Sequence, residues 1–293
     1  MMTSRKRKNI ILGTALWGWG IDQRTAYELL DNFVQVGGRY IDVAQNYPIN
    51  KQKQDFGLAA KWLTEWITIN GERDVSIILK VGSLDNMGGS ETNLSASNIR
   101  SSEAEFREKW GAALAALAIH WDNRDDDEFE GIQETINVLS DFFRRGGGIG
   151  FSGVQRPDLY LKAAPELAKD WWIQVKENAL TDSARLKYSK CFPDSTYIAY
   201  GINMGGLKNA PQEDSSSSKL RGIEYSDELI LRLSKLLASD HGLNPVPRNF
   251  NELALSTMYR SKCLSGVIVA PRSLPQLQST MSFWKALVEQ VSL

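Results

Sequence analysis

The chain has 293 residues and a formal net charge of −1, from 34 Lys and Arg residues and 35 Asp and Glu residues. This balance gives no electrostatic reason to expect a nucleic acid or an acidic membrane surface as a partner. No apolar run approaches membrane-spanning length, and Cys191 and Cys263 lack metal-ligand spacing, so we expect a soluble cytoplasmic protein without a metal site.

Short apolar runs alternate with amphipathic segments along the chain, which is typical of a parallel sheet with crossover helices. The runs that we interpret as strands are residues 10–16, 40–43, 75–80, 114–120, 149–152, 171–175, 196–200 and 266–270. The segments that we interpret as helices are residues 22–36, 53–69, 99–112, 125–145, 157–168, 227–239, 250–260 and 274–290. Eight such units predict an α/β fold, a closed (β/α)8 TIM barrel, as a single domain over residues 1–293.

Two polar segments interrupt this alternation. Residues 82–97 are rich in Gly, Ser and Asn, and residues 208–226 contain four consecutive serines. Both are expected to be long loops that could act as lids over a site. The acidic run 125–128 and His241 lie at predicted helix ends, where we expect capping.

Four residues suited to proton transfer lie at or just past the ends of three consecutive predicted strands. Asp42 ends the second strand and Tyr47 follows in a polar loop, while Lys80 closes the third strand and His120 the fourth. Such strand ends meet at one face of a barrel and carry the chemistry of these folds. We therefore expect the four side chains to converge there.

The order and spacing of these residues resemble the aldo-keto reductase family. The pattern Asp42-x-Ala44-x-x-Tyr47, then Lys80 and His120, is similar to the catalytic set of that family. Further similar segments are Leu12-Gly13-Thr14, Ile149-Gly150-Phe151-Ser152 and Pro271-Arg272-Ser273-x-x-Gln276. Because the similarity runs in order along essentially the whole chain, it implies NADPH-dependent reduction of an aldehyde or ketone on a (β/α)8 barrel.

The chemistry of the residues agrees with this implication. Carbonyl reduction needs a hydride, which no side chain supplies, so a nicotinamide must be bound. The proton can come from Tyr47, whose phenol is a weak acid until the ammonium of Lys80 lowers its pKa. Asp42 can hold Lys80 charged and oriented, and His120 can donate a hydrogen bond to the carbonyl oxygen.

The resemblance also implies which residues bind the cofactor. Ser152 and Gln174 match the residues that hold the nicotinamide carboxamide, and Tyr200 matches the aromatic residue that stacks on the nicotinamide ring. Arg272 and Ser273 match the residues that bind the adenosine 2′-phosphate, which favours NADPH over NADH. The adenine-side glutamine of the family is matched by Gln276.

Several positions depart from the family pattern on the cofactor side. Gly153 replaces the usual Asn after the fifth-strand Ser, so one carboxamide contact is missing. Ala270 stands where the family has a Gly before the phosphate loop, and Thr280 stands where it has an Asn four residues after the equivalent of Gln276. Gly201-Ile202-Asn203 replaces the usual Ser-Pro-Leu after the seventh strand. These changes leave the catalytic set intact but alter the expected cofactor geometry.

Three tryptophans follow predicted strands at the expected mouth of the barrel. Trp17 and Trp19 follow the first strand and Trp121 follows His120, so they could provide flat apolar walls for a substrate. The alternative for each is packing against neighbouring loops. The unusual loops are the basis for naming a sugar or a secondary-metabolite intermediate as the carbonyl substrate.

Two motifs suggest a Rossmann-type dehydrogenase instead. Residues 148–153 match G-x-G-x-x-G, but a helical pattern leads into these glycines, whereas the fingerprint must follow a strand. Tyr47 and Lys51 match Y-x-x-x-K, which lies on a helix in short-chain dehydrogenases, but Pro48 predicts a turn at this place. We therefore keep an open-sheet reductase only as a weak alternative.

Two other functional classes fit the same fold. A regulatory subunit would bind the cofactor with little turnover, and the altered cofactor side favours this reading while the intact catalytic set opposes it. A cofactor-assisted isomerase or dehydratase would form product without net loss of NADPH. The sequence leaves the substrate and the choice between monomer and homo-oligomer open.

Overall fold

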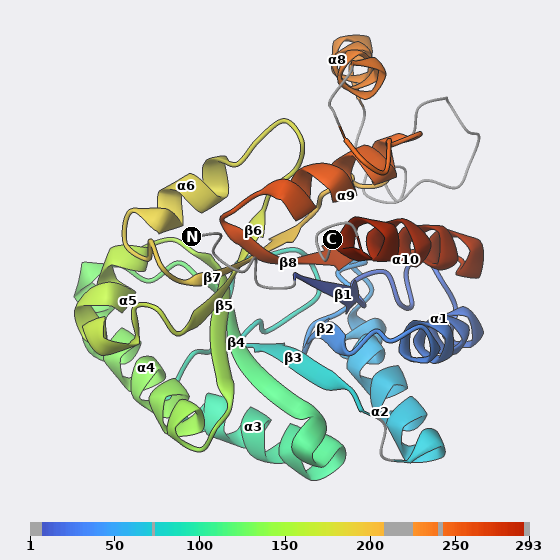
Figure 1. Cartoon of the computed structure of the whole chain (residues 1–293). Coiled ribbons are helices and arrows are strands. Elements are labelled where there is room, and N and C mark those ends of the chain that lie inside the picture. The colour runs from blue at the N-terminus through green and yellow to red at the C-terminus, as the bar shows by residue number, and fades with distance from the viewer. Residues whose placement is uncertain (1–7, 72–73, 208–224, 240–242, 290–293) are drawn as a thin grey trace.

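Eight parallel strands form a closed barrel in the computed structural model, in which each strand pairs with the next and β8 pairs with β1 (Figure 1). The structure describes residues 8–71, 74–207, 225–239 and 243–289. The strands are β1 (Asn9–Gly13), β2 (Tyr40–Ala44), β3 (Ser76–Val81), β4 (Leu114–Asp122), β5 (Gly148–Val154), β6 (Trp171–Lys176), β7 (Thr196–Tyr200) and β8 (Leu264–Val269). The predicted (β/α)8 barrel is confirmed, and the open-sheet alternative is wrong.

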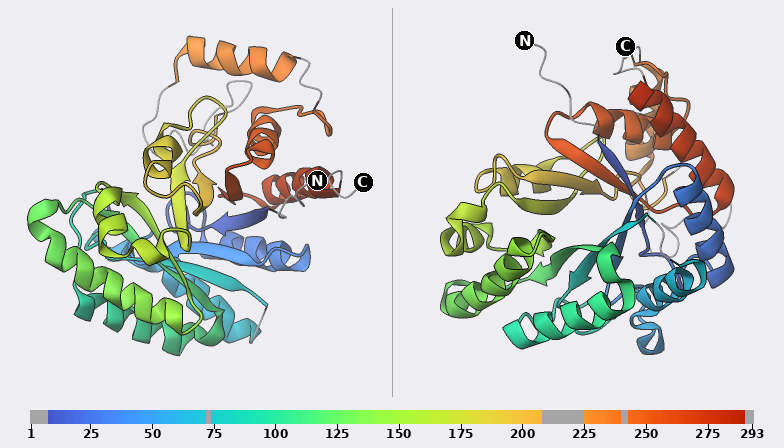
Figure 2. Two further views of the ribbon diagram at one scale, coloured as in Figure 1. Left: turned by 60° about the vertical axis from the view of Figure 1, so that its left-hand side comes forward. Right: turned by 60° about the horizontal axis from the view of Figure 1, so that its bottom comes forward.

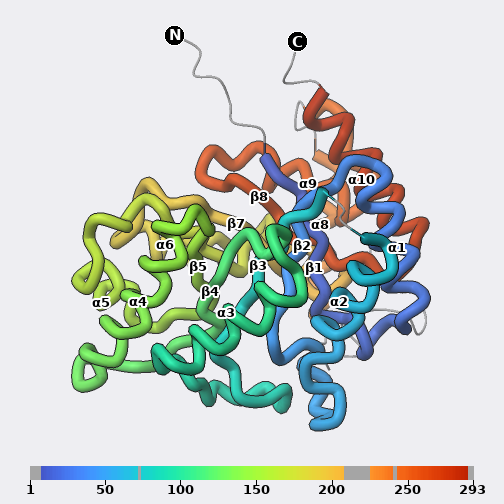
Figure 3. Tube along the Cα trace, turned by 90° about the horizontal axis from the view of Figure 1, so that it is seen from below, coloured from blue at the N-terminus to red at the C-terminus, as the bar shows by residue number. Residues whose placement is uncertain are grey.

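Helices surround the barrel between successive strands (Figures 2 and 3). They are α1 (Gln23–Gln35), α2 (Leu58–Asn70), α3 (Ala96–Trp110), α4 (Phe129–Arg144), α5 (Pro157–Ala163), α6 (Ser183–Ser189), α8 (Asp227–Ala238), α9 (Phe250–Arg260) and α10 (Leu274–Glu289). Helix α8 packs on α9 and stands away from the strands (Figure 2, left). Among the described helices, none combines the length and apolar character that crossing a bilayer requires.

Three helical segments differ from the prediction for local reasons. The helix expected from residue 53 begins at Leu58, because Gly57 adopts a left-handed conformation with φ 77° and separates it from a short 3-10 turn. The helix expected over residues 157–168 ends at Ala163, and Pro165 starts a separate 3-10 turn. Helix α6 was not predicted, since it buries only Tyr188 and so lacks an apolar stripe.

Two further predictions, the loop at 208–226 and the helix cap at His241, fall largely or wholly on residues outside those that the structure describes.

Side-chain alternation along the strands carries polar groups into the barrel mouth. The barrel interior holds an apolar cluster consisting of Ile11, Ile78, Ala116, Ala118, Ile198 and Ile268. Residues two positions apart on a strand share a face. Lys80 follows Ile78 and His120 follows Ala118 at this spacing, so both continue the interior rows toward the C-terminal ends of their strands. Asp42 does the same after Tyr40, which packs against the interior cluster.

The glycines that resemble a dinucleotide fingerprint lie within β5 and serve packing. A Cβ atom on Gly150 would lie 2.4 Å from the carbonyl oxygen of Trp172, and one on Gly148 would lie 3.3 Å from the Trp172 ring. The missing side chains therefore leave room for Trp172, which packs against the interior cluster. This confirms that the motif marks a strand and not a phosphate-binding turn.

Candidate active site

Asp42 and Lys80 form a buried ion pair at the C-terminal mouth of the barrel. Lys80 Nζ lies 2.7 Å from Asp42 Oδ2, and the two side chains are 4% and 3% exposed. Strands β2 and β3 set this contact, with Ala44 opposite Lys80 in the sheet register. Removing either partner would leave an unpaired buried charge, so each residue stabilises the other in place.

Tyr47 reaches this ion pair from the turn that follows β2. Its backbone N–H donates to the carbonyl of Ala44 at 3.2 Å, which folds the loop back over the strand end. Lys80 Nζ then donates to Tyr47 Oη at 2.7 Å. Since the ammonium is the donor in this contact, the hydroxyl hydrogen of Tyr47 remains available for another acceptor.

Gln174 on β6 closes the cluster from the opposite side of the barrel. Its Nε2 donates to Asp42 Oδ1 at 2.6 Å, and its Oε1 accepts from Lys80 Nζ at 3.3 Å. The sequence predicted Gln174 only as a ligand of the nicotinamide carboxamide. The structure adds that this amide bridges both members of the ion pair, and it retains one N–H and one lone pair for a further contact.

His120 lies beside Tyr47 at the end of β4. The two ring centroids are 5.6 Å apart at 88°, and the indole of Trp121 stacks on the imidazole at 4.2 Å and 27°. His120 Nδ1 is 3.1 Å from Asn46 Oδ1 and 3.4 Å from Ser83 Oγ. The four predicted catalytic residues are thus brought together, with Asn46 and Ser83 as additional neighbours.

Burial and charge pull the pKa values of these groups in different directions. Burial raises the pKa of Tyr47 above 10.0, and the Lys80 charge acts against this rise without cancelling it. For Lys80, burial acts to lower the pKa, but Asp42 and Tyr47 hold it above its ordinary value. Burial and the Lys80 charge lower the pKa of His120 well below 6.5. At neutral pH the site therefore holds a protonated phenol, an ammonium and a neutral imidazole.

The residues predicted for the nicotinamide carboxamide line up across adjacent strands. Ser152 pairs in register with His120 on one side and with Gln174 on the other, and both Ser152 and Gln174 are buried. Tyr200, at the end of β7, is partly buried; burial raises its pKa, while Lys80 and the Ser152 side chain act to lower it. A hydroxyl, an amide and an aromatic ring in this order fit a nicotinamide ring with its carboxamide.

The structure explains why Gly153 stands where the family has Asn. Gly153 has φ +79°, and a Cβ atom there would lie 2.5 Å from Trp121 Cδ1. Trp121 itself has φ 63°, which turns its indole over His120. The tryptophan therefore occupies the space that a side chain at position 153 would need.

The predicted phosphate ligands lie where α10 begins. The Arg272 guanidinium donates to the carbonyl of Gly20 through Nη2 at 3.1 Å, and its backbone N–H donates to Gln276 Oε1 at 2.9 Å. A hollow of about 630 Å³ beside Arg272 is lined by Arg272, by residues of the β1–α1 loop that include Trp19, and by residues of α1 and α2. A guanidinium and a hydroxyl, that of Ser273, at a helix N-terminus fit a phosphate monoester.

Two further departures from the family pattern are connected to each other. Asn203 Nδ2 donates to Asn251 Oδ1 at 2.6 Å, and Asn251 Nδ2 donates to Thr280 Oγ1 at 3.1 Å. Thr280 is buried on α10, and Asn203 lies in the loop after β7. This chain of hydrogen bonds ties that loop to α9 and α10, so the two substitutions act as one unit.

The three predicted substrate-side tryptophans separate into two kinds. Trp17 is 1% exposed and belongs to the core outside the barrel, which corresponds to the packing alternative. Trp19 lines the hollow that also contains Arg272, and Trp121 stacks on His120. Trp19 and Trp121 thus lie beside other predicted site residues.

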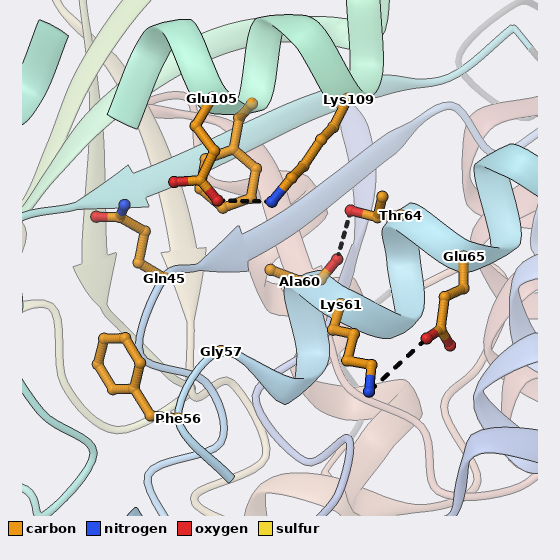
Figure 4. A pocket seen from close by; sticks show the side chains of 10 residues that line it. Gln45, Phe56, Gly57, Ala60, Lys61, Thr64, Glu65, Glu105 and Lys109 are labelled. Atoms are coloured by element: carbon orange, nitrogen blue, oxygen red, sulfur yellow. Dashed lines mark hydrogen bonds and ion pairs between the residues drawn. The ribbon is translucent and has the colours of Figure 1, made fainter. Parts of the chain in front are cut away.

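A second hollow, of about 350 Å³, lies between α2 and α3 on the outside of the barrel (Figure 4). Its charged side chains pair among themselves, with Lys109 on Glu105 at 2.6 Å and Lys61 on Glu65 at 3.9 Å. None of the predicted site residues lines it. Its charges are already compensated, and we assign no function to it.

Asn46 and Ser83 were not predicted from the sequence as site residues. Both are buried and both contact His120. Asn46 lies inside the motif that was used for the resemblance, immediately before Tyr47, so its amide was a visible signal. Ser83 belongs to the segment 82–97, whose polar composition gave no indication that one of its residues is buried.

Comparison with known proteins agrees with the fold. The Aldo/keto reductase family profile matches residues 9–291. The Saccharomyces cerevisiae protein AAD6, named as an aryl-alcohol dehydrogenase, is 26% identical over 155 residues, which cover 48% of this chain and 66% of AAD6. The match therefore spans just under two thirds of that relative.

Solved structures show the same architecture. The aldo-keto reductase AKR11C1 from Bacillus halodurans, in a holo form, superposes with a TM-score of 0.69 at 18% identity, covering 99% of this chain and 96% of its own. An aldo-keto reductase from Pseudomonas aeruginosa gives a TM-score of 0.59 at 19% identity, covering 97% and 90%. At this sequence identity the similarity shows a shared fold and nothing more.

The chain belongs to the aldo/keto reductase family, because the family profile covers nearly all of it.

Proposed function

We propose that this protein is an NADPH-dependent reductase that converts an aldehyde or ketone to an alcohol. One observation carries the proposal: a buried ammonium, Lys80, lies 2.7 Å from both a carboxylate, Asp42, and a phenol, Tyr47. A protonated phenol held against a cation is suited to give up its proton, because the cation stabilises the phenolate that remains. Bound NADPH would supply the hydride.

Each member of the site has a role in the proton step. Tyr47 donates its hydroxyl proton to the substrate oxygen, and Lys80 stabilises the resulting phenolate. Asp42 and Gln174 hold the ammonium in position by accepting its other hydrogen bonds. His120, beside Tyr47, orients the substrate carbonyl. Together these groups supply protonation and orientation at one end of the C=O bond.

The same proposal assigns the cofactor and substrate contacts. Ser152, Gln174 and Tyr200 would hold the nicotinamide, while Arg272 and Ser273 would bind the 2′-phosphate and Gln276 the adenine side. Trp19 and Trp121 would provide apolar walls for the substrate. The position of Arg272 at the start of α10 supports the preference for NADPH over NADH.

Oxidation of NADPH and NADH in the presence of a panel of aldehydes, ketones and sugars tests this proposal. We expect carbonyl-dependent oxidation with a lower KM for NADPH than for NADH. Arg272→Ala should raise the KM for NADPH about tenfold or more and leave that for NADH nearly unchanged, since a lost charge-assisted contact is worth about 1.5–3 kcal/mol. Arg24→Ala, on the exposed side of α1, is the matched control. NADPH binding without turnover of any carbonyl would contradict a reductase and favour a regulatory subunit.

A further inference from the structure

Asn46 has a fixed amide orientation in a fully buried position. Its Nδ2 donates to the carbonyl of Asp85 at 3.0 Å, and its Oδ1 lies 3.1 Å from His120 Nδ1. The opposite orientation would place Oδ1 against the carbonyl oxygen of Asp85, with two acceptors and no hydrogen between them. The oxygen of Asn46 therefore faces the imidazole.

This orientation decides which ring nitrogen of His120 carries the hydrogen. An amide oxygen can only accept, so Nδ1 must donate to it. Ser83 agrees, because its Oγ lies 3.3 Å from the carbonyl oxygen of His120 and 3.4 Å from Nδ1. Its single hydrogen can go to the carbonyl, which leaves the oxygen as a second acceptor for Nδ1–H. With the other tautomer, the lone pairs of Nδ1 and Asn46 Oδ1 would face each other.

A neutral imidazole has one N–H, so an Nδ1–H leaves Nε2 with a lone pair. Burial and the neighbouring Lys80 charge keep the pKa of His120 well below 6.5, so the ring is neutral at physiological pH. Over the part of the chain that the structure describes, Nε2 has no hydrogen-bond partner.

We propose that Asn46 is a positioning residue that holds His120 as the Nδ1–H tautomer, so that Nε2 offers the site an acceptor and not a donor. This inference rests on the proposed function and revises one role within it, because the sequence had suggested that His120 donates to the carbonyl oxygen. Tyr47 is then the neutral donor to that oxygen. A hydroxyl group next to the carbonyl can donate to Nε2, which favours hydroxylated carbonyl substrates.

The tautomer can be observed directly by NMR. The chain contains two histidines, so full-length protein labelled with [15N]histidine gives two imidazole spin systems, and His241→Gln assigns them. At pH 7, without substrate or cofactor, we expect His120 to show a protonated Nδ1 and an unprotonated Nε2. A protonated Nε2 with a bare Nδ1 would overturn the inference.

Two substitutions test whether Asn46 makes this choice. Asn46→Asp keeps an acceptor at the same place, and we expect it to retain the Nδ1–H tautomer. Asn46→Leu has a similar size but no acceptor, and we expect Nε2–H to appear as a substantial population. Retention of pure Nδ1–H in Asn46→Leu would contradict the role of Asn46. Should that variant fail to fold, the wild-type spectrum still decides the tautomer.

Substrate comparison tests the acceptor role at Nε2. We expect the wild type to show a KM for 2-hydroxypropanal several-fold below that for propanal, and Asn46→Leu to lose this difference. Equal KM values in the wild type would contradict the acceptor role. The NMR spectrum can be recorded without any turnover, so the two proposals can fail separately. Absence of carbonyl reduction would contradict the proposed function only, and a protonated Nε2 would contradict this inference only.

Discussion

Two buried groups in this protein each combine a carboxylate, a cation and a tyrosine. The mouth group consists of Asp42, Lys80 and Tyr47, and the helix-side group consists of Asp122, Arg124 and Tyr160. In the mouth group the cation contacts the phenol, since Lys80 Nζ donates to Tyr47 Oη at 2.7 Å. In the helix-side group the phenol gives its hydrogen to the carboxylate, since Tyr160 Oη donates to Asp122 Oδ2 at 2.7 Å, and Arg124 interacts with the Tyr160 hydroxyl as well.

This difference decides what each tyrosine can do. The Tyr160 proton is held by a carboxylate, and burial together with Asp122 raises the Tyr160 pKa well above 10.0, although the Arg124 charge acts against this rise. Burial also raises the pKa of Tyr47 and the Lys80 charge opposes that rise, but here the phenol oxygen accepts from Lys80, so its own hydrogen is not given to Asp42. A carboxylate, a cation and a tyrosine are therefore arranged to suit proton donation in the mouth group, as we propose, and anchoring in the helix-side group.

The largest difference should appear when the cation of each group is removed. Lys80→Met removes the stabilisation of the phenolate, and we expect carbonyl reduction to fall by about 10²–10⁴-fold. Arg124→Met should leave the activity of the folded protein within a few-fold. Both variants leave a buried carboxylate unpaired, so each should lose about 3–5 kcal/mol of unfolding free energy. Steady-state kinetics and urea unfolding of both variants measure these effects. Equal losses of activity would show that the mouth group has no special role in the reaction.

Removing the hydroxyl groups should affect stability more in the helix-side group than in the mouth group. Tyr160→Phe takes a donor from the buried Asp122, and we expect a loss of about 1–3 kcal/mol in unfolding free energy. Tyr47→Phe should cost less, because Lys80 keeps its contacts with Asp42 and Gln174. Urea unfolding of both proteins at pH 7 gives the two values. A larger loss for Tyr47→Phe would mean that its hydroxyl is a structural group as well.

His120 should make the protein sensitive to acid. Its pKa is near 6.5 in the unfolded chain and well below that when folded, so between these values the unfolded chain binds one more proton. The stabilisation is complete above pH 6.5 and is lost as the pH falls toward the folded-state pKa, by about 1.4 kcal/mol per pH unit. Urea unfolding at pH 7, 6 and 5 should show a shallower pH dependence in His120→Gln than in the wild type. An unchanged slope would mean that the buried ring does not drive the acid sensitivity.

The smallest effect is expected for an ion pair outside both groups. Arg24 and Glu28 on α1 are 3.0 Å apart, but their side chains are 87% and 47% exposed. Arg24→Gln should change the unfolding free energy by less than about 0.5 kcal/mol, because water screens this pair. A loss as large as that of Arg124→Met would show that burial is not what separates these pairs.

Strand ends could be predicted from the sequence because their signal is local. Strand β7 and helix α9 were predicted with the observed bounds, and Asp42, Lys80 and His120 were recognised as strand-end residues before their contacts were known. The helix-side group was not predicted, because it depends on Trp121. This residue has φ 63°, which interrupts the alternation of inward and outward side chains along β4. Asp122 contacts Tyr160 of α5 and, through Arg124, Thr135 of α4.

The link between Asn46 and His120 was also beyond the sequence. These residues are separated by 74 positions, and their contact follows from barrel closure and from the loop that carries Asp85. The contacts of Gln174 could not be predicted from the sequence either. Its hydrogen bonds to both Asp42 and Lys80 become evident only from the position of β6 in the closed barrel. Such contacts depend on the closed sheet as a whole.

The most direct test of this account is a single-turnover measurement on Tyr47→Phe and Tyr160→Phe, each preloaded with NADPH and mixed with an aldehyde that the wild type reduces. Fluorescence of the bound nucleotide first establishes that both variants are loaded. We expect Tyr47→Phe to reduce the aldehyde about 10²–10⁴-fold more slowly than the wild type, while Tyr160→Phe stays within a few-fold. Reduction by Tyr47→Phe at the wild-type rate would contradict this account.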